Sequence, residues 1–220
     1  GYFPVPPVDT LQDLRSEAIL KMIECGIDIE VHHHEVATAG QGEIDMRFQS
    51  LTLMADWVML HKYILKNVAR SHGKTATFMP KPYADQTGSG AHFNMSFTSL
   101  DTGATLMGDA SDARGCGLSK LAYQFLGGTL AHAPAVVATT CPIVNSYKRL
   151  IKSGSMTGYT WAPIYISYGG NNRTHMVRVP GPGRFELRLP DGATNRRGYD
   201  AAIIGSSRCD GYCWSWWIVW

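Results

Sequence analysis

Residues 32–43 read HHHEVATAGQGE and place three histidines and two carboxylates within a dozen positions. Just upstream, apolar and polar residues alternate from Ile27 to Val31, which predicts a β-strand that runs into the histidines. Successive side chains of a strand point to opposite faces, so three adjacent histidines cannot all bind one ion. If the alternation continues, His33 and Glu35 share the inner face of this strand.

The two carboxylates of this stretch, Glu35 and Glu43, are better candidates for metal ligands than the histidines. A zinc site is disfavoured because the sequence holds no H-E-x-x-H motif and no useful pair of C-x-x-C motifs. Hard carboxylate oxygens suit Mg²⁺ or Mn²⁺, which commonly bind together with substrate phosphates. The alternative is that both are solvated loop charges, and their spacing alone leaves that open.

Both helices and strands are expected along the chain. Apolar residues recur at helical spacing between Thr10 and Gly26, over residues 51–72 and over residues 118–139. Thr10 can cap the first helix with Asp13 three residues on, and Pro134 breaks or restarts the third. Strands are expected at 75–79, at 91–98 and three times within 161–189. This mixture predicts an α+β fold.

Composition limits the function classes. The chain has 220 residues, 45% of them hydrophobic, which suits one globular domain or the larger part of one. A net charge of +2 gives no reason to expect a nucleic acid or a membrane surface as partner. Five scattered cysteines indicate reduced thiols in the cytoplasm, and neither a leader nor a membrane-spanning run is found. Because the first residue is Gly1, we expect a fragment that lacks its N-terminal part.

The tail differs from the rest, so we divide the chain into residues 1–195 and an atypical tail at 196–220. Four of the six tryptophans lie within residues 214–220. Such a cluster is an aggregation hazard if exposed. It is either a buried strand or, as we favour, sequence that is non-native or out of frame.

Basic residues gather in the C-terminal half, namely Lys148, Arg149, Arg173, Arg178, Arg184 and Arg188. Arg184, Glu186 and Arg188 alternate and so share one strand face. Such a face is costly to bury unless it binds ions, and guanidinium groups match carboxylate and phosphate oxygens. A solvent-facing edge strand with paired charges is the alternative. A glycine-rich turn at 87–91 leads into His92, which is either a core histidine or a ligand.

Six segments together resemble the motifs of the glutamine synthetase family, in the family's order across residues 1–195. They are GYFPVPPVD at 1–9, HHHEVATAGQGE at 32–43, KTATFMPKP at 74–82, GSGAH at 88–92, NSYKRL at 145–150 and NR at 172–173. The resemblance implies an incomplete catalytic domain of that family, with a mostly antiparallel curved sheet and flanking helices.

The resemblance also implies residue roles. The implied ligands of two metal ions are Glu35 and Glu43 for the first, and His92 and Glu186 for the second. The positions implied to contact ATP or its phosphates are Glu30, His33, Ser96, Arg178 and Arg184. The positions implied at the substrate are Gly88, Arg149 and Arg188, with Arg173 at the transferred phosphoryl group.

The implied reaction is ligation of ammonia to the γ-carboxylate of glutamate, with ATP as co-substrate and Mg²⁺ or Mn²⁺ as cofactor. Further metal-site carboxylates of the family lie upstream of Gly1, so this chain is expected to be inactive alone, or to be an inactive truncated relative. Thr87 stands where the commonest form of the family has asparagine, and Asn94 stands where it has histidine. Trp161 stands where that form has an acidic residue that binds ammonium.

An indole suits an alkylammonium at least as well as ammonium. Residues 115–120 and 154–158 resemble the type III branch, which is also similar to γ-glutamylmethylamide synthetase, so methylammonium is the rival substrate. Members of the family are ring-shaped dodecamers, and the full-length protein is expected to be one.

Overall fold

A computed structural model describes residues 2–152 and 161–194, together with the backbone of the strand at 212–219. The helices are α1 (Gln12–Glu24), α2 (Leu51–Ser71), α3 (Lys120–Ala131), α4 (Ala133–Thr140) and α5 (Val144–Arg149). The strands are β1 (Ile29–His34), β2 (Gly42–Ser50), β3 (Ala91–Phe97), β4 (Tyr168–Gly169), β5 (Val177–Gly181), β6 (Arg184–Leu187) and β7 (Tyr212–Val219). Both helices and strands are present, as the α+β prediction requires.

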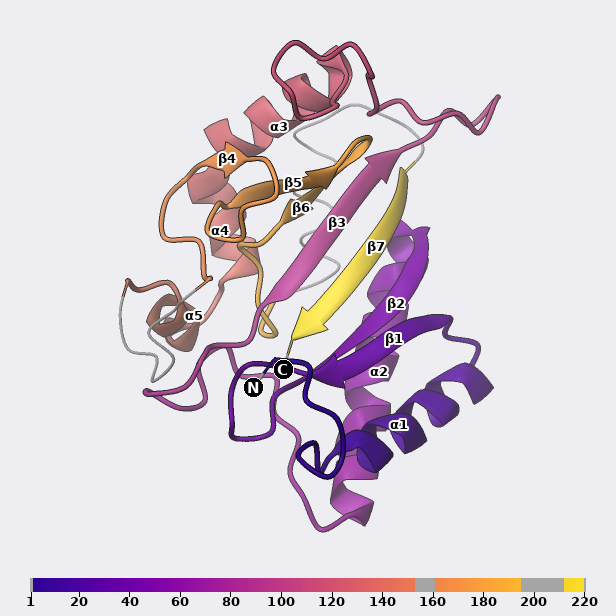
Figure 1. The fold of residues 1–220 in the computed structure, drawn as a ribbon, viewed down its shortest axis with the longest axis vertical. Coiled ribbons are helices and arrows are strands. Elements are labelled where there is room, and N and C mark those ends of the chain that lie inside the picture. Colours follow the sequence, from indigo (N-terminus) through magenta and orange to yellow (C-terminus); the bar gives the residue numbers. More distant parts are fainter. Residues whose placement is uncertain (1, 153–160, 195–211, 220) are drawn as a thin grey trace.

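The strands form one sheet in the order β1-β2-β7-β3-β6-β5-β4 (Figure 1). Every neighbouring pair is antiparallel except β4 with β5. The last strand in the sequence, β7, therefore lies in the middle of the sheet, where its backbone pairs with both β2 and β3. A mostly antiparallel sheet flanked by helices is confirmed.

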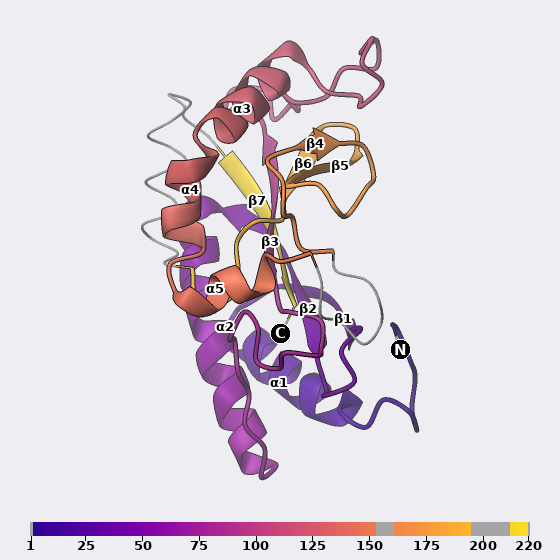
Figure 2. The same cartoon turned by 90° about the vertical axis from the view of Figure 1, so that its left-hand side faces the viewer.

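The sheet has one apolar face and one polar face because its strands alternate. The side chains of Phe93 and Phe185 are completely buried, and Phe125 of α3 packs on Phe185, with the two ring centroids 5.6 Å apart. Figure 2 shows α2, α3 and α4 on this side of the sheet. The intervening residues point the other way, and Asn94 of β3 is paired with Glu186 of β6. Strand register thus gathers the polar candidates on the face that points away from these helices.

The helices differ from expectation in detail. α2 and the α3–α4 pair occupy the expected ranges, and Pro134 lies in the first turn of α4, so it restarts the helix. The expected cap by Thr10 is wrong. Leu11 occupies the cap position, and its N–H donates to the carboxylate of Asp9 over 3.1 Å.

The strand expected at residues 75–79 is also wrong. The segment is extended, but it joins no sheet. Its aromatic residue, Phe78, packs on α2 instead, where its ring lies 5.5 Å from that of His61. The alternating Thr-Ala-Thr-Phe pattern therefore reflects packing on a helix rather than strand pairing.

β1 ends at His34, one residue short of Glu35. Glu35 begins a loop that closes on itself, because its N–H donates to the carbonyl of Gln41 over 2.8 Å.

Residues 195–211 and 220 of the tail lie outside the described residues. The origin of the tail stays a prediction, although the pairing of β7 agrees with the strand alternative. In the described part of the chain, no helix has the length and apolar character needed to cross a membrane.

Candidate active site

The β1–β2 hairpin brings the two carboxylates of residues 32–43 together. Register pairs His33 with Glu43, and the His33 Nε2 atom is 3.0 Å from the Glu43 carboxylate. One ligand atom from each of His33, Glu35 and Glu43 lies within 4.8 Å of the others, and all three residues are buried. Glu35 also accepts the N–H of Val36 over 2.8 Å. This group has the donor set and size of a cation site.

The electrostatics of this hairpin agree with a cation site. Burial, and then the neighbouring Glu43 carboxylate, raise the pKa of Glu35 to about 8. Burial and Glu43 likewise raise the pKa of Asp45, two residues along β2, to about 9. Buried carboxyl groups this close cannot all ionise unless a positive charge joins them. The residues present therefore fit a hard divalent cation such as Mg²⁺ or Mn²⁺.

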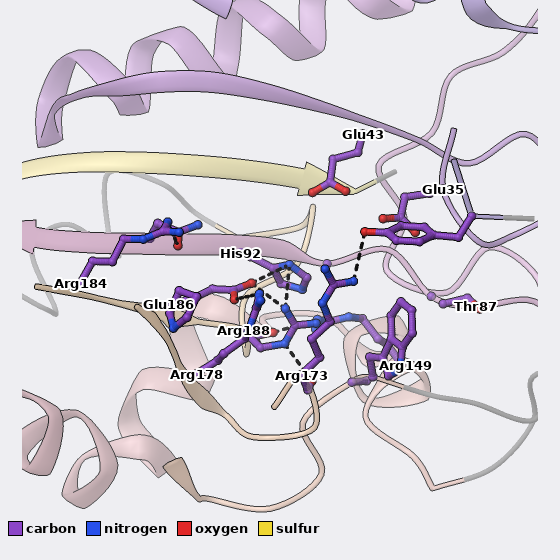
Figure 3. Close-up of a pocket in the computed structure, with 17 residues that line it drawn as sticks. Glu35, Glu43, Thr87, His92, Arg149, Arg173, Arg178, Arg184, Glu186 and Arg188 are labelled. Atoms are coloured by element: carbon purple, nitrogen blue, oxygen red, sulfur yellow. Dashed lines mark hydrogen bonds and ion pairs between the residues drawn. The ribbon is translucent and has the colours of Figure 1, made fainter. Parts of the chain in front are cut away.

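His92 and Glu186 form a second group on β3 and β6 (Figure 3). The His92 Nδ1 atom lies 3.2 Å from the Glu186 carboxylate. Burial, and then the charge of Arg188, hold the pKa of His92 well below its usual value, so the imidazole is neutral. Arg188 and Arg178 donate to the two Glu186 oxygens over 2.6 and 2.8 Å. A neutral imidazole beside a carboxylate is a competent pair of ligands.

The two groups hold separate positions. Glu43 lies on β2 and His92 on β3, with β7 between them. Two strand spacings amount to about 10 Å, which exceeds the span of a single coordination sphere. The two groups therefore fit two separate ions better than one.

The glycine-rich turn before β3 is shaped by close contacts. A Cβ on Gly90 would lie 2.6 Å from the His92 ring, and one on Gly88 would lie 2.8 Å from the Pro80 carbonyl oxygen. Behind the turn, buried Arg149 donates to the carbonyls of Leu189 and Arg188, both over 2.9 Å. Positions 88 and 90 must therefore be glycine for the backbone to approach this arginine and histidine.

The carboxylates Glu35, Glu43 and Glu186, together with His92 and the arginines, face one pocket of about 140 Å³. The sequence-predicted residues that line it are Glu35, Glu43, Gly88, His92, Arg149, Trp161, Arg173, Arg178, Arg184, Glu186 and Arg188. Arg184, Glu186 and Arg188 are together on its wall, where Arg184 donates to Asn94 over 3.0 Å. An anion with several charges would be matched by these guanidinium groups.

Three of the sequence-predicted residues are not in the pocket lining. Glu30 is exposed on β1, Ser96 lies further along β3, and His33 contacts Glu43 from the neighbouring strand. Their nucleotide roles stay predictions. Sequence reasoning missed Tyr2, which lines the pocket, and Asp45. Tyr2 could have been found from its place in the first motif, and Asp45 from its i, i+2 spacing to Glu43.

Comparison with known proteins agrees with this geometry. The family model described as "Glutamine synthetase, catalytic domain" matches residues 1–206. The chain belongs to the glutamine synthetase family. A glutamine synthetase from Microchaete diplosiphon is 46% identical over 201 residues, which cover 89% of this chain and 40% of that protein. The Escherichia coli K12 glutamine synthetase is 46% identical over 200 residues, with the same coverage.

Solved structures show the glutamine synthetase catalytic-domain fold. A structure described as a GmaS–ADP complex has a TM-score of 0.82 at 42% identity, and covers 94% of this chain and 47% of that one. A Plasmodium falciparum glutamine synthetase has a TM-score of 0.81 at 31% identity, with 94% and 39% coverage. The chain thus spans about 40% of the length of the curated relatives.

Proposed function

We propose that this chain is part of an ATP-dependent ligase that joins ammonia to the γ-carboxylate of glutamate and releases glutamine, ADP and phosphate. The observation that carries the proposal is the pocket itself, in which two carboxylate-containing groups face a set of arginines. A carboxylate is a poor acyl donor, so its oxygen first attacks the γ-phosphorus of ATP, and ADP leaves. The amine then attacks the acyl carbon of γ-glutamyl phosphate, loses a proton and expels phosphate.

Phosphoryl transfer requires positioning and charge neutralisation more than covalent help from the protein. Glu35 and Glu43 would hold one divalent ion and His92 and Glu186 another, and each ion supplies positive charge at phosphate oxygens when bound. Arg173 lines the pocket and adds a fixed charge for the transferred group.

Arg149 and Arg188 would hold the substrate carboxylates. Burial lowers the pKa of both, because each guanidinium has given up water. An incoming carboxylate restores the lost stabilisation of that charge. Gly88 lines the same pocket, where its backbone would lie beside the substrate amino group.

Methylamine is the second candidate amine. The observation that favours it is Trp161, which lines the pocket at the position where the commonest form of the family has an acidic residue that would attract a small cation. The GmaS–ADP structure at 42% identity supports keeping this alternative. The free cysteines Cys25, Cys116 and Cys141 support a cytoplasmic setting, and the family supports a homo-oligomer, with a dodecamer as the expected state of the complete protein.

The test is a chimera in which residues 1–195 replace the matching segment of the Microchaete diplosiphon relative. We expect phosphate release from ATP that depends on both glutamate and an amine. An inactive chimera beside an active parent relative, or ATP hydrolysis without need of glutamate, would contradict the proposal. The ratio of kcat/KM for ammonium and methylammonium then decides the amine. A strong ammonium preference left unchanged by Trp161→Glu would remove the methylamine alternative.

A further inference from the structure

The guanidinium of Arg173 lies against two aromatic rings in the pocket. Its Cζ atom is 5.5 Å from the centroid of the Tyr2 ring and 5.2 Å from that of Trp161. The two rings are 5.9 Å apart with an interplanar angle of 77°. Arg173 Nη1 also donates to the Tyr2 hydroxyl over 3.1 Å. One cation therefore contacts two aromatic faces and one hydroxyl, contributed by segments far apart in the sequence.

The backbone of Arg173 is fixed independently of its side chain. Its carbonyl accepts from Arg188 Nε over 2.9 Å, and Arg188 in turn donates to Glu186. An arginine side chain otherwise has many rotamers and loses considerable entropy when held in one of them. The two rings restrict this freedom before any ligand arrives, which is how preorganisation improves binding.

We propose that Tyr2 and Trp161 are positioning residues that hold the Arg173 guanidinium toward the pocket, where it neutralises a phosphate group. We call Tyr2, Trp161 and the Arg173 guanidinium that they hold the clamp. The identity of the anion rests on the proposed function, whereas the clamp itself rests only on the geometry. Burial raises the pKa of Tyr2, so the hydroxyl remains neutral and accepts from Arg173 without a proton transfer.

The clamp also changes the role of Trp161. A cationic amine and the Arg173 guanidinium repel each other, so an alkylammonium cannot share the surface of the ring that Arg173 contacts. Trp161 then influences the amine indirectly, through the position of Arg173, rather than as a direct cation–π partner of the substrate.

The first test measures coupling within the clamp in the 220-residue chain without any ligand. Thermal unfolding is compared for Tyr2→Leu, Arg173→Ala and the double variant, with Tyr63→Leu on the exposed surface of α2 as matched control. We expect the shifts in Tm of the two single variants to be non-additive by about 2–4 °C. Additive shifts would overturn the clamp.

The second test measures the binding of inorganic phosphate by titration calorimetry. We expect Tyr2→Leu to weaken binding by about three- to tenfold and Tyr2→Phe, which keeps the ring, to weaken it less. In the Arg173→Ala background, Tyr2→Leu should change nothing further. A loss of the same size in both backgrounds would overturn the positioning role.

The two tests separate this inference from the proposed function. Coupled Tm shifts in a chain that binds no phosphate would uphold the clamp and overturn the assignment of Arg173 to phosphate, and with it a part of the proposed function. Additive shifts in a chain that binds phosphate would overturn the clamp and leave the proposed function standing.

Discussion

Glu35→Gln should stabilise the metal-free protein, by an amount that depends on pH. The pKa of Glu35 is raised from 4.5 to about 8 in the folded state, so the folded protein retains a proton that the unfolded chain releases. The contribution of this group to stability is therefore greatest below pH 4.5 and is lost as the pH rises from 4.5 to 8. pH 7 lies 2.5 units above the unperturbed pKa of 4.5. At about 1.36 kcal/mol per unit, the folded protein has therefore lost about 3 kcal/mol of its free energy of unfolding at pH 7.

Glutamine has nearly the same shape as glutamate and carries no charge. The free energy of unfolding of the variant therefore does not decrease in this way as the pH rises. We expect its Tm in chelator-treated buffer to exceed that of the parent by about 6–12 °C at pH 7 and to match it near pH 4. Glu24→Gln removes an exposed carboxylate and should change Tm little at either pH. A variant that is no more stable than the parent at pH 7 would refute the claim that the Glu35 carboxyl is held at an energetic cost.

Three further substitutions test the fold and the site by urea unfolding. Asp9→Ala leaves Arg15 buried without its ion-pair partner and should lower the free energy of unfolding by about 3–5 kcal/mol; a loss below about 1 kcal/mol would mean that water replaces the carboxylate. Glu186→Gln removes the charge that compensates two arginines, so we expect a loss of similar size, about 3–5 kcal/mol, and an unchanged midpoint would contradict the network. Phe93→Ala empties a fully buried position and should cost about 3–5 kcal/mol, against almost nothing for exposed Tyr63→Ala; equal effects would contradict the assignment of the core.

The sequence predicted the helices better than the loops and strands. Apolar spacing found α2 to within a residue, because a long amphipathic helix repeats its signal over many turns. Residues 75–79 carried a strand pattern yet joined no sheet, since a period of two does not say whether the partner is a strand or a helix. Nothing local could place β7 between β2 and β3, because strand order is set by contacts distant in sequence.

The candidate site was found through motifs rather than through periodicity. Spacing alone left Glu35 open as a solvated loop charge, and only its burial beside Glu43 decides that it is not one. The pairing of Asn94 with Glu186 also lay beyond sequence reasoning, since it joins strands more than ninety residues apart. The contact of Arg173 with Tyr2 could not be predicted either, because the two residues are 171 positions apart in the sequence.

We propose that residues 32–43 hold a divalent ion beside a phosphate-binding pocket. A titration of the chain with Mn²⁺ above pH 8, where Glu35 is ionised, would detect this ion by electron paramagnetic resonance. We expect saturable binding that ADP strengthens and that Glu35→Gln weakens by at least about tenfold, while Glu24→Gln leaves it unchanged. Equal Mn²⁺ binding by the parent and the Glu35→Gln variant would contradict the claim.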